Sequence, residues 1–103
     1  MYYGFTLTKR ETAMRTEEEI AKAANDAYES YDFGDGIEVT DAGTWEYTTP
    51  GLERSRRVYV ESEREDDGPR PRWTLNFTVR FNEAGNVEES YALDDKGQFW
   101  GHA

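Results

Sequence analysis

The chain has 103 residues, with 22 acidic and 12 basic side chains, which gives a formal net charge of −10 at neutral pH. This length fits one domain. The absence of cysteine excludes disulfides, thiolate nucleophiles and zinc–thiolate sites. Because no apolar run approaches membrane length and the N-terminal residues lack the order of a signal peptide, we expect a single soluble, cytoplasmic domain over 1–103 with no membrane partner.

The first predicted elements are a strand and a helix. Apolar and polar residues alternate over Tyr2–Thr8, which predicts a strand. Thr16 and Glu19 have the spacing of a capping box at a helix start. Apolar residues then recur at three- and four-residue intervals and define one helical face: Ile20, Ala23, Ala24, Ala27, Tyr28 and Tyr31. We predict a helix over about 16–32, ended by Gly34 in the left-handed conformation.

The rest of the chain predicts consecutive short strands separated by turn-length spacers. Their expected ranges are 37–40, 44–49, 55–63, 72–82, 87–93 and 98–100. The strand over 72–82 has the most apolar alternating face, so we expect it at the centre of the sheet. The residues expected to point inward are Ile37, Val39, Trp45, Tyr47, Val58, Val60, Trp73, Leu75, Phe77, Val79 and Phe81, and a further apolar face comprises Val87, Tyr91 and Leu93.

Together these elements predict an α+β fold. We expect an antiparallel sheet of five to seven strands, mostly a meander, with the one helix packed on one face. The expected order is β-α-β-β-β-β-β. The sheet edges at Tyr2–Thr8 and Gln98–Trp100 could pair between two copies, so a homodimer is one possible assembly.

The sequence argues against catalysis. The only histidine, His102, is next to last, where a base is normally exposed, so no Ser–His or Cys–His pair is expected. Adjacent acids such as Asp94 and Asp95 fall in turns or on opposite strand faces, not in the contrasting environments that acid–base work needs. The acids from Asp32 to Asp41 lack the spacing of an EF-hand loop. We therefore expect no enzyme activity, no cofactor and no metal.

A group of arginines raises the question of nucleic acid binding. With Tyr59 and Trp73, they could form a single-strand platform on an open sheet face: Arg54, Arg56, Arg57, Arg70, Arg72 and Arg80. The net charge opposes this, and interleaved glutamates can pair with the arginines across strands: Glu53, Glu61, Glu63 and Glu65. We predict cross-strand ion pairs and no direct contact with nucleic acid.

The acids are concentrated in one part of the chain. Residues 16–48 contain ten acids and one base, whereas 69–80 contain three arginines and no acid. Carboxylates presented like phosphates attract a basic groove by the electrostatics that DNA uses. This profile resembles, in character only, small DNA-mimic inhibitors and immunity proteins against nuclease toxins.

We predict a non-enzymatic inhibitor of a basic, nucleic-acid-binding protein or nucleoprotein complex. The expected setting is a phage or mobile element that acts against a restriction or CRISPR system. The expected contacts are Glu18, Asp26, Glu29, Asp32, Asp35, Glu38 and Asp41. The alternatives are an immunity or antitoxin protein, a small α+β enzyme or ligand-binding domain with a pocket between helix and sheet, and a housekeeping domain of a halophilic or GC-rich source.

Overall fold

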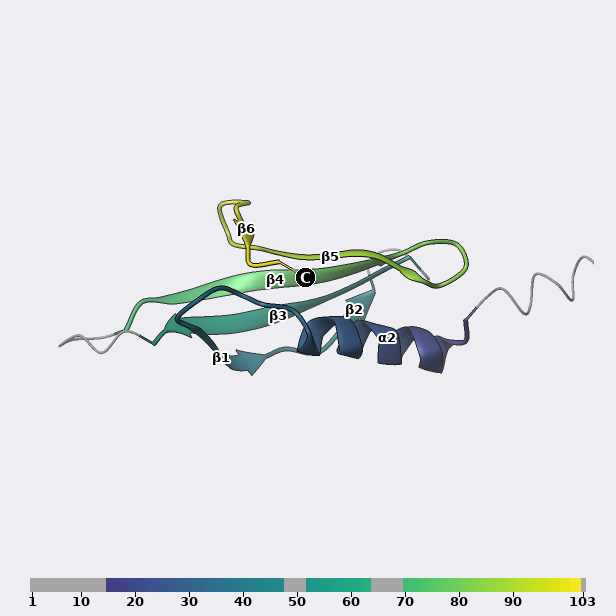
Figure 1. Cartoon of the computed structure of the whole chain (residues 1–103), viewed down its shortest axis with the longest axis horizontal. Coiled ribbons are helices and arrows are strands. Elements are labelled where there is room, and N and C mark those ends of the chain that lie inside the picture. The colour runs from purple at the N-terminus through teal and green to yellow at the C-terminus, as the bar shows by residue number, and fades with distance from the viewer. Residues whose placement is uncertain (1–14, 48–51, 64–69, 103) are drawn as a thin grey trace, which may run out of the picture.

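The computed structural model describes residues 15–47, 52–63 and 70–102, and the predicted strand Tyr2–Thr8 lies outside them. Within them, one helix precedes the strands of a six-stranded antiparallel sheet and packs on it (Figure 1). The elements are α2 (Glu17–Glu29), β1 (Ile37–Ala42), β2 (Glu46–Tyr47), β3 (Glu53–Ser62), β4 (Arg72–Phe81), β5 (Val87–Leu93) and β6 (Phe99–Trp100). The predicted α+β class is confirmed.

The long hairpin of β3 and β4 forms the middle of the sheet, whose strand order is β1-β3-β4-β5-β6. β2 also pairs with β3. β1 lies beside the second half of β3 and β2 beside its first half, so they form one interrupted edge and are not a hairpin. The predicted meander therefore holds from β3 onward, and β4 is central as expected.

α2 begins where the sequence predicts. Thr16 Oγ1 accepts a hydrogen bond from the Glu19 amide at 3.1 Å, and Glu19 Oε1 accepts one from the Thr16 amide at 2.8 Å. These two bonds complete the capping box. The backbone hydrogen bond from Thr16 is the main cause of the lowered pKa of Glu19.

The C-terminal end of the helix differs from the prediction. α2 stops at Glu29 with Ser30 as its cap, before the predicted end at 32. Gly34 has a φ of +126° but lies in the following loop, where its amide donates to Asp32 Oδ1 at 2.9 Å. The early exit has a packing reason, because both Tyr31 and Phe33 turn into the core.

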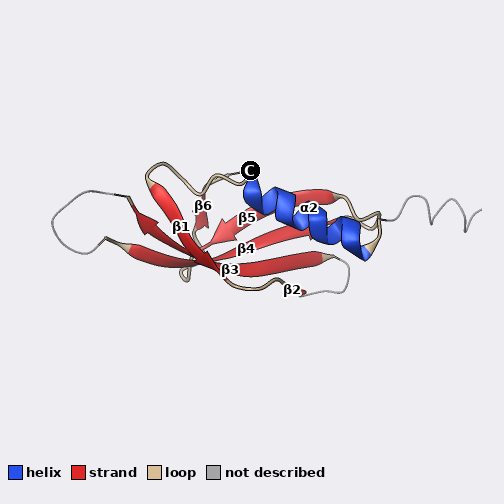
Figure 2. Ribbon diagram, turned by 90° about the horizontal axis from the view of Figure 1, so that it is seen from below, coloured by secondary structure: helices blue, strands red, loops and turns tan. Residues whose placement is uncertain are grey.

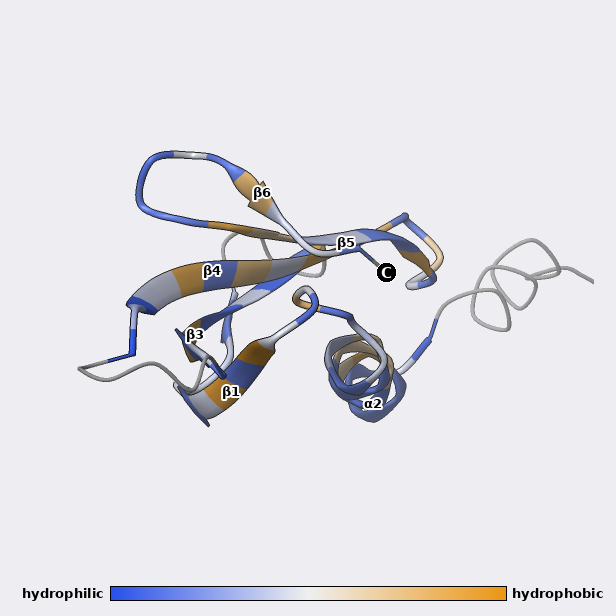
Figure 3. Ribbon diagram, turned by 60° about the vertical axis from the view of Figure 1, so that its left-hand side comes forward, coloured by the Kyte–Doolittle hydropathy of each residue, from blue (hydrophilic) through white to orange (hydrophobic). Residues whose placement is uncertain are grey.

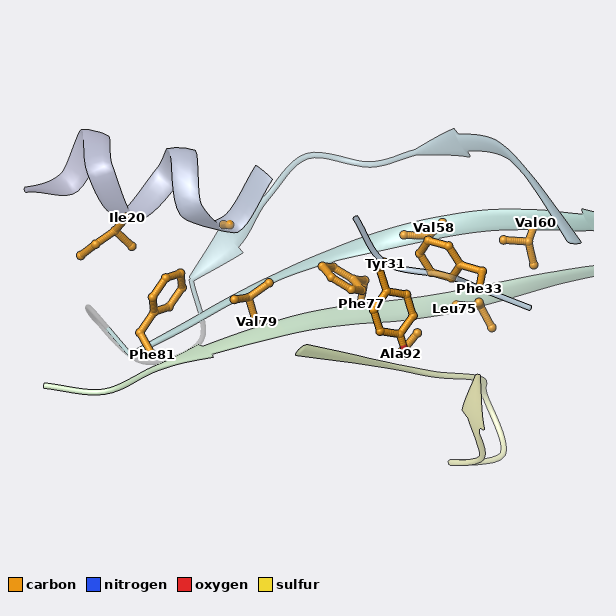
Figure 4. Close-up of a cluster of buried hydrophobic side chains, with 11 residues drawn as sticks. Ile20, Tyr31, Phe33, Val58, Val60, Leu75, Phe77, Val79, Phe81 and Ala92 are labelled. Atoms are coloured by element: carbon orange, nitrogen blue, oxygen red, sulfur yellow. The ribbon is translucent and has the colours of Figure 1, made fainter. Parts of the chain in front are cut away.

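The core lies between one sheet face and the helix with the segment that follows it. Figure 2 shows α2 crossing β4 and β5, and Figure 3 shows the helix on one side of the sheet. The buried apolar residues are Ile20, Ala24, Tyr31, Phe33, Val58, Val60, Leu75, Phe77, Val79, Phe81 and Ala92, most of them labelled in Figure 4. The ring of Phe77 lies 5.4 Å from that of Tyr28 and 5.0 Å from that of Tyr31, between centroids. We call this side of the sheet the covered face and the opposite side the open face.

Several inward predictions need correction. Val39 is 38% exposed and Tyr47 is 60% exposed, because both lie on the interrupted edge strand, away from the strands that α2 contacts. Trp73 is only partly buried. On β5, the buried residue is Ala92, which pairs with Phe77. Of the predicted apolar face of β5, Tyr91 and Leu93 therefore belong to the open face, whereas Val87 lies opposite Phe81 beyond a register shift and is 41% exposed.

Candidate partner-binding surface

The outer side of α2 carries a line of carboxylates. The buried Ile20 and Ala24 define its inner side. At about 100° per residue, Glu18 and Glu29 point in nearly the same direction, opposite Ile20 and about 16 Å apart along the axis. Asp26 points about 80° away from Glu18 and about 60° away from Glu29 around the axis, and all three acids are exposed. The helix therefore presents two aligned carboxylates, about three turns apart, with a third to one side.

The three acids on the outer side of α2 differ in whether a cation pairs with them. Asp26 forms an ion pair with Lys22 at 3.0 Å. Within the described part of the chain, Glu18 and Glu29 have no hydrogen bond or ion pair to their side chains. An exposed i, i+4 pair such as Lys22–Asp26 contributes little and is screened by salt. The line keeps a net negative charge.

Two predicted contacts lie in the loop after the helix. Asp32 Oδ2 is 3.8 Å from His102 Nε2, and the backbones of the two residues form an isolated antiparallel bridge. Asp35 is exposed and its carboxylate has no partner within 15–47, 52–63 or 70–102. We call the set Glu18, Asp26, Glu29, Asp32 and Asp35 the helix-side acidic surface.

The other two predicted contacts point away from this surface. In the β1–β3 register, Glu38 lies opposite Glu61 and Asp41 opposite Tyr59, which places both acids on the open face. Glu38 is also 3.9 Å from Arg70. The structure thus divides the predicted residues between two sides of the sheet, and a single flat partner surface cannot contact all of them.

The open face is a network of ion pairs, as the sequence predicted. Glu61 lies 3.5 Å from Arg70 and 3.3 Å from Arg72. Arg80 lies 3.6 Å from both Glu53 and Glu89. These are cross-strand or near-strand neighbours, so the predicted pairing is confirmed for Glu53 and Glu61, while Glu65 lies outside the described residues. This pairing removes much of the positive field that a nucleic acid platform needs.

Two arginines have a role that the sequence reasoning missed. Arg54 is buried at 1% exposure, donates to Glu17 Oε2 at 2.9 Å and lies 3.9 Å from the ring of Tyr47. Arg56 donates to the carbonyl oxygen of Gly43 from Nε at 3.0 Å and Nη2 at 2.7 Å. Both share the alternation of Val58, so strand parity alone places them on the covered face.

The titratable groups with shifted pKa values have structural partners. Burial raises the pKa of Tyr28 and of Tyr31, and the Tyr31 hydroxyl donates to the Trp100 carbonyl. The backbone hydrogen bond from Gln98 is the main cause of the lowered pKa of Asp94, which also accepts from the Trp100 indole. These contacts fix the loop after α2 and the β5–β6 turn, and none joins an acid to a base across a cleft.

Three further features concern a ligand pocket, a metal site and a membrane span. The space between α2 and the sheet is filled by core side chains, whereas an open groove of about 610 Å³ lies over β1, β3 and β4. Among the described residues, no group of three or more acidic, histidine or cysteine side chains is arranged to hold a metal. No helix within them has the length and apolar character of a membrane span.

Comparison of the chain with protein-family models, with curated proteins and with solved structures finds no match in any of the three. What the chain binds is therefore inferred from its own geometry and charge.

Proposed function

We propose that this chain is a non-enzymatic acidic protein that inhibits a basic, nucleic-acid-binding partner. The helix-side acidic surface occupies the groove in which the partner holds nucleic acid. The setting we propose is a phage or mobile element that acts against a restriction or CRISPR complex. The observation that supports this most is the pair of exposed carboxylates of Glu18 and Glu29 on one line of α2, neither of which has a side-chain partner among the described residues.

A rigid carrier makes these charges more effective. The capping box fixes the first turn of α2, and the Arg54–Glu17 contact fastens that turn to β3. Preorganised charge costs less ordering on binding than charge on a loose segment. A field of one sign also steers encounter with an oppositely charged partner, and this effect weakens with salt.

The test compares two variants that lose the same amount of charge. The first carries Glu18→Gln, Glu29→Gln and Asp35→Asn on the helix-side acidic surface. The control carries three neutralised acids elsewhere that are also exposed: Glu63→Gln, Glu83→Gln and Glu88→Gln. Each protein is immobilised and exposed to the heparin-retained protein fraction of candidate host cells at about 0.05 M and about 0.5 M salt.

The expected result is a protein captured by the native chain and by the control at low salt, released at high salt, and not captured by the helix-side variant. The native chain should also displace DNA from that protein. Capture that survives loss of the helix-side acids, or that leaves the DNA complex intact, contradicts the proposal.

A further inference from the structure

The open-face groove has a defined lining. It is formed by Thr40, Asp41, Tyr59, Val60, Arg72, Trp73, Thr74 and Asp95, and its volume is about 610 Å³. This volume lies in the range of sites that bind small organic molecules. No residue of the helix-side acidic surface is in the lining, so the groove is separate from the surface proposed above.

A β-bulge shapes one wall of the groove. The β1–β3 register shifts between Val39 and Asp41, and both Thr40 and Asp41 line the groove next to Tyr59. The Thr40 hydroxyl donates to the Tyr59 carbonyl at 3.2 Å, which fixes the bulge. Such bulges redirect side chains at sheet edges. Here the bulge adds a carboxylate beside an exposed phenol ring.

A second carboxylate lies at the opposite end of the groove. Asp95 belongs to the β5–β6 turn, is exposed, and has no partner for its carboxylate within the described residues. Asp41, Tyr59 and Thr74 form one row across β1, β3 and β4, and Asp95 follows the end of β5, which pairs with β4. At about 4.8 Å between strands, the row separates the two carboxylates by roughly 14 Å of backbone.

The one cation of the lining is already neutralised. Arg72 Nε lies 3.3 Å from Glu61 Oε2, and the side chain of Arg72 is 81% exposed. Arg72 can therefore keep its ion pair with Glu61 when a positively charged ligand binds in the groove. Two separated acids, with hydroxyl oxygens and the Tyr59 ring between them, suit a long aliphatic molecule with ammonium groups near both ends.

We infer that this groove binds a linear aliphatic polyamine. One terminal ammonium group contacts Asp41 and the other contacts Asp95. The alkyl chain between them lies over the ring of Tyr59. The length of the row selects polyamines over short diamines. This inference does not depend on the proposed inhibitory function, because it uses different residues.

The test is calorimetric titration of the full chain with spermidine in dilute buffer. The groove variant Asp41→Asn with Asp95→Asn should weaken binding about tenfold, as the loss of two exposed ion contacts implies. The matched control Glu29→Gln with Asp35→Asn removes the same charge from the helix-side acidic surface. It should change the affinity by less than about twofold, because those sites are distant and exposed. Tyr59→Leu should also weaken binding, with the circular dichroism of all variants unchanged.

Putrescine tests the length argument and should bind more weakly than spermidine. The inference is overturned if the two charge variants weaken spermidine binding equally, which would show a diffuse charge effect. It is also overturned if spermidine does not bind, if putrescine binds as well, or if a tetra-arginine peptide binds the groove more tightly than spermidine does.

Discussion

Arginine side chains have opposite environments on the two faces of the sheet. On the covered face, Arg54 is enclosed by aromatic rings and by the first turn of α2. On the open face, Arg72 and Arg80 stay partly or largely exposed beside glutamates. All three belong to the central hairpin of β3 and β4. The position of an arginine in the strand alternation decides which face it lies on. On the face that the helix covers its charge stabilises the fold, and on the other face its charge stays at the surface.

The two faces also differ in how much they contribute to the stability of the fold. Burial of large apolar and aromatic side chains dominates stability, and those side chains lie on the covered face. Exposed ion pairs contribute about 0–1 kcal/mol each. Substitutions on the two faces should thus differ strongly in their effect on the free energy of unfolding.

The largest effect is expected at the centre of the core. Phe77 is fully buried and surrounded by rings, so Phe77→Ala should lower the free energy of unfolding by about 3–5 kcal/mol. On the open face, Arg80→Ala is the control and should cost less than about 1 kcal/mol. Urea unfolding followed by tryptophan fluorescence measures both. Equal losses would show that the open face contributes to stability as the covered face does.

A smaller effect is expected where the buried guanidinium meets the helix. Glu17→Ala leaves Arg54 without its carboxylate partner and should cost about 1–3 kcal/mol, since Nε and Nη1 already have no hydrogen-bond partner within the described residues. Glu18→Ala is the control for the helix dipole, since it lies in the same turn and has no side-chain partner within the described residues. Arg54→Met removes the buried charge itself and should cost less than Glu17→Ala does. The reverse order in chemical unfolding would contradict this account of the contact.

The smallest effect is expected at the β5–β6 turn and depends on pH. Hydrogen bonds from Gln98, Trp100 and Lys96 lower the pKa of Asp94 below its ordinary 3.8. A lowered folded-state pKa gives stability that is present above pH 3.8 and is lost as the pH falls through the folded value. Asp94→Asn should reduce Tm at pH 7 by a few degrees, and the difference from the native chain should shrink toward pH 2.

Asp95→Asn in the same turn is the matched control. Its carboxylate has no partner among the described residues, so the pH profile of Tm should match that of the native chain. A constant gap between Asp94→Asn and the native chain from pH 7 to pH 2 would mean that charge at Asp94 is not what stabilises the turn.

Much of the fold could be predicted from local patterns. The alternation from Trp73 to Phe81 predicts a central strand, and Thr16 with Glu19 predicts the start of α2, because both patterns act over a few residues. The helix end could not be predicted, since Tyr31 continues the helical spacing yet reaches the core only after the chain has left the helix. The burial of Arg54 also depends on a tertiary partner, Glu17, and the arginine itself looks like a surface residue.

The candidate site was only partly predictable for a similar reason. Exposure of the acids follows from their chemistry, but their grouping depends on where α2 lies. Helical spacing places Glu18 and Glu29 together in any helix. Glu38 and Asp41 are close to the other acids in sequence, yet β1 turns them to the open face because the helix covers the opposite one. The concentration of acids in one part of the sequence therefore predicted a larger acidic surface than the structure has.

The most direct test of the central claim is the salt dependence of binding to a captured basic partner. The logarithm of the association constant, plotted against the logarithm of salt concentration, has a slope that reports the number of charge contacts. The account predicts a shallower slope for the Glu18→Gln, Glu29→Gln, Asp35→Asn variant than for the native chain, and the native slope for the Glu63→Gln, Glu83→Gln, Glu88→Gln control. Equal slopes for both variants would contradict a binding role for the helix-side acidic surface.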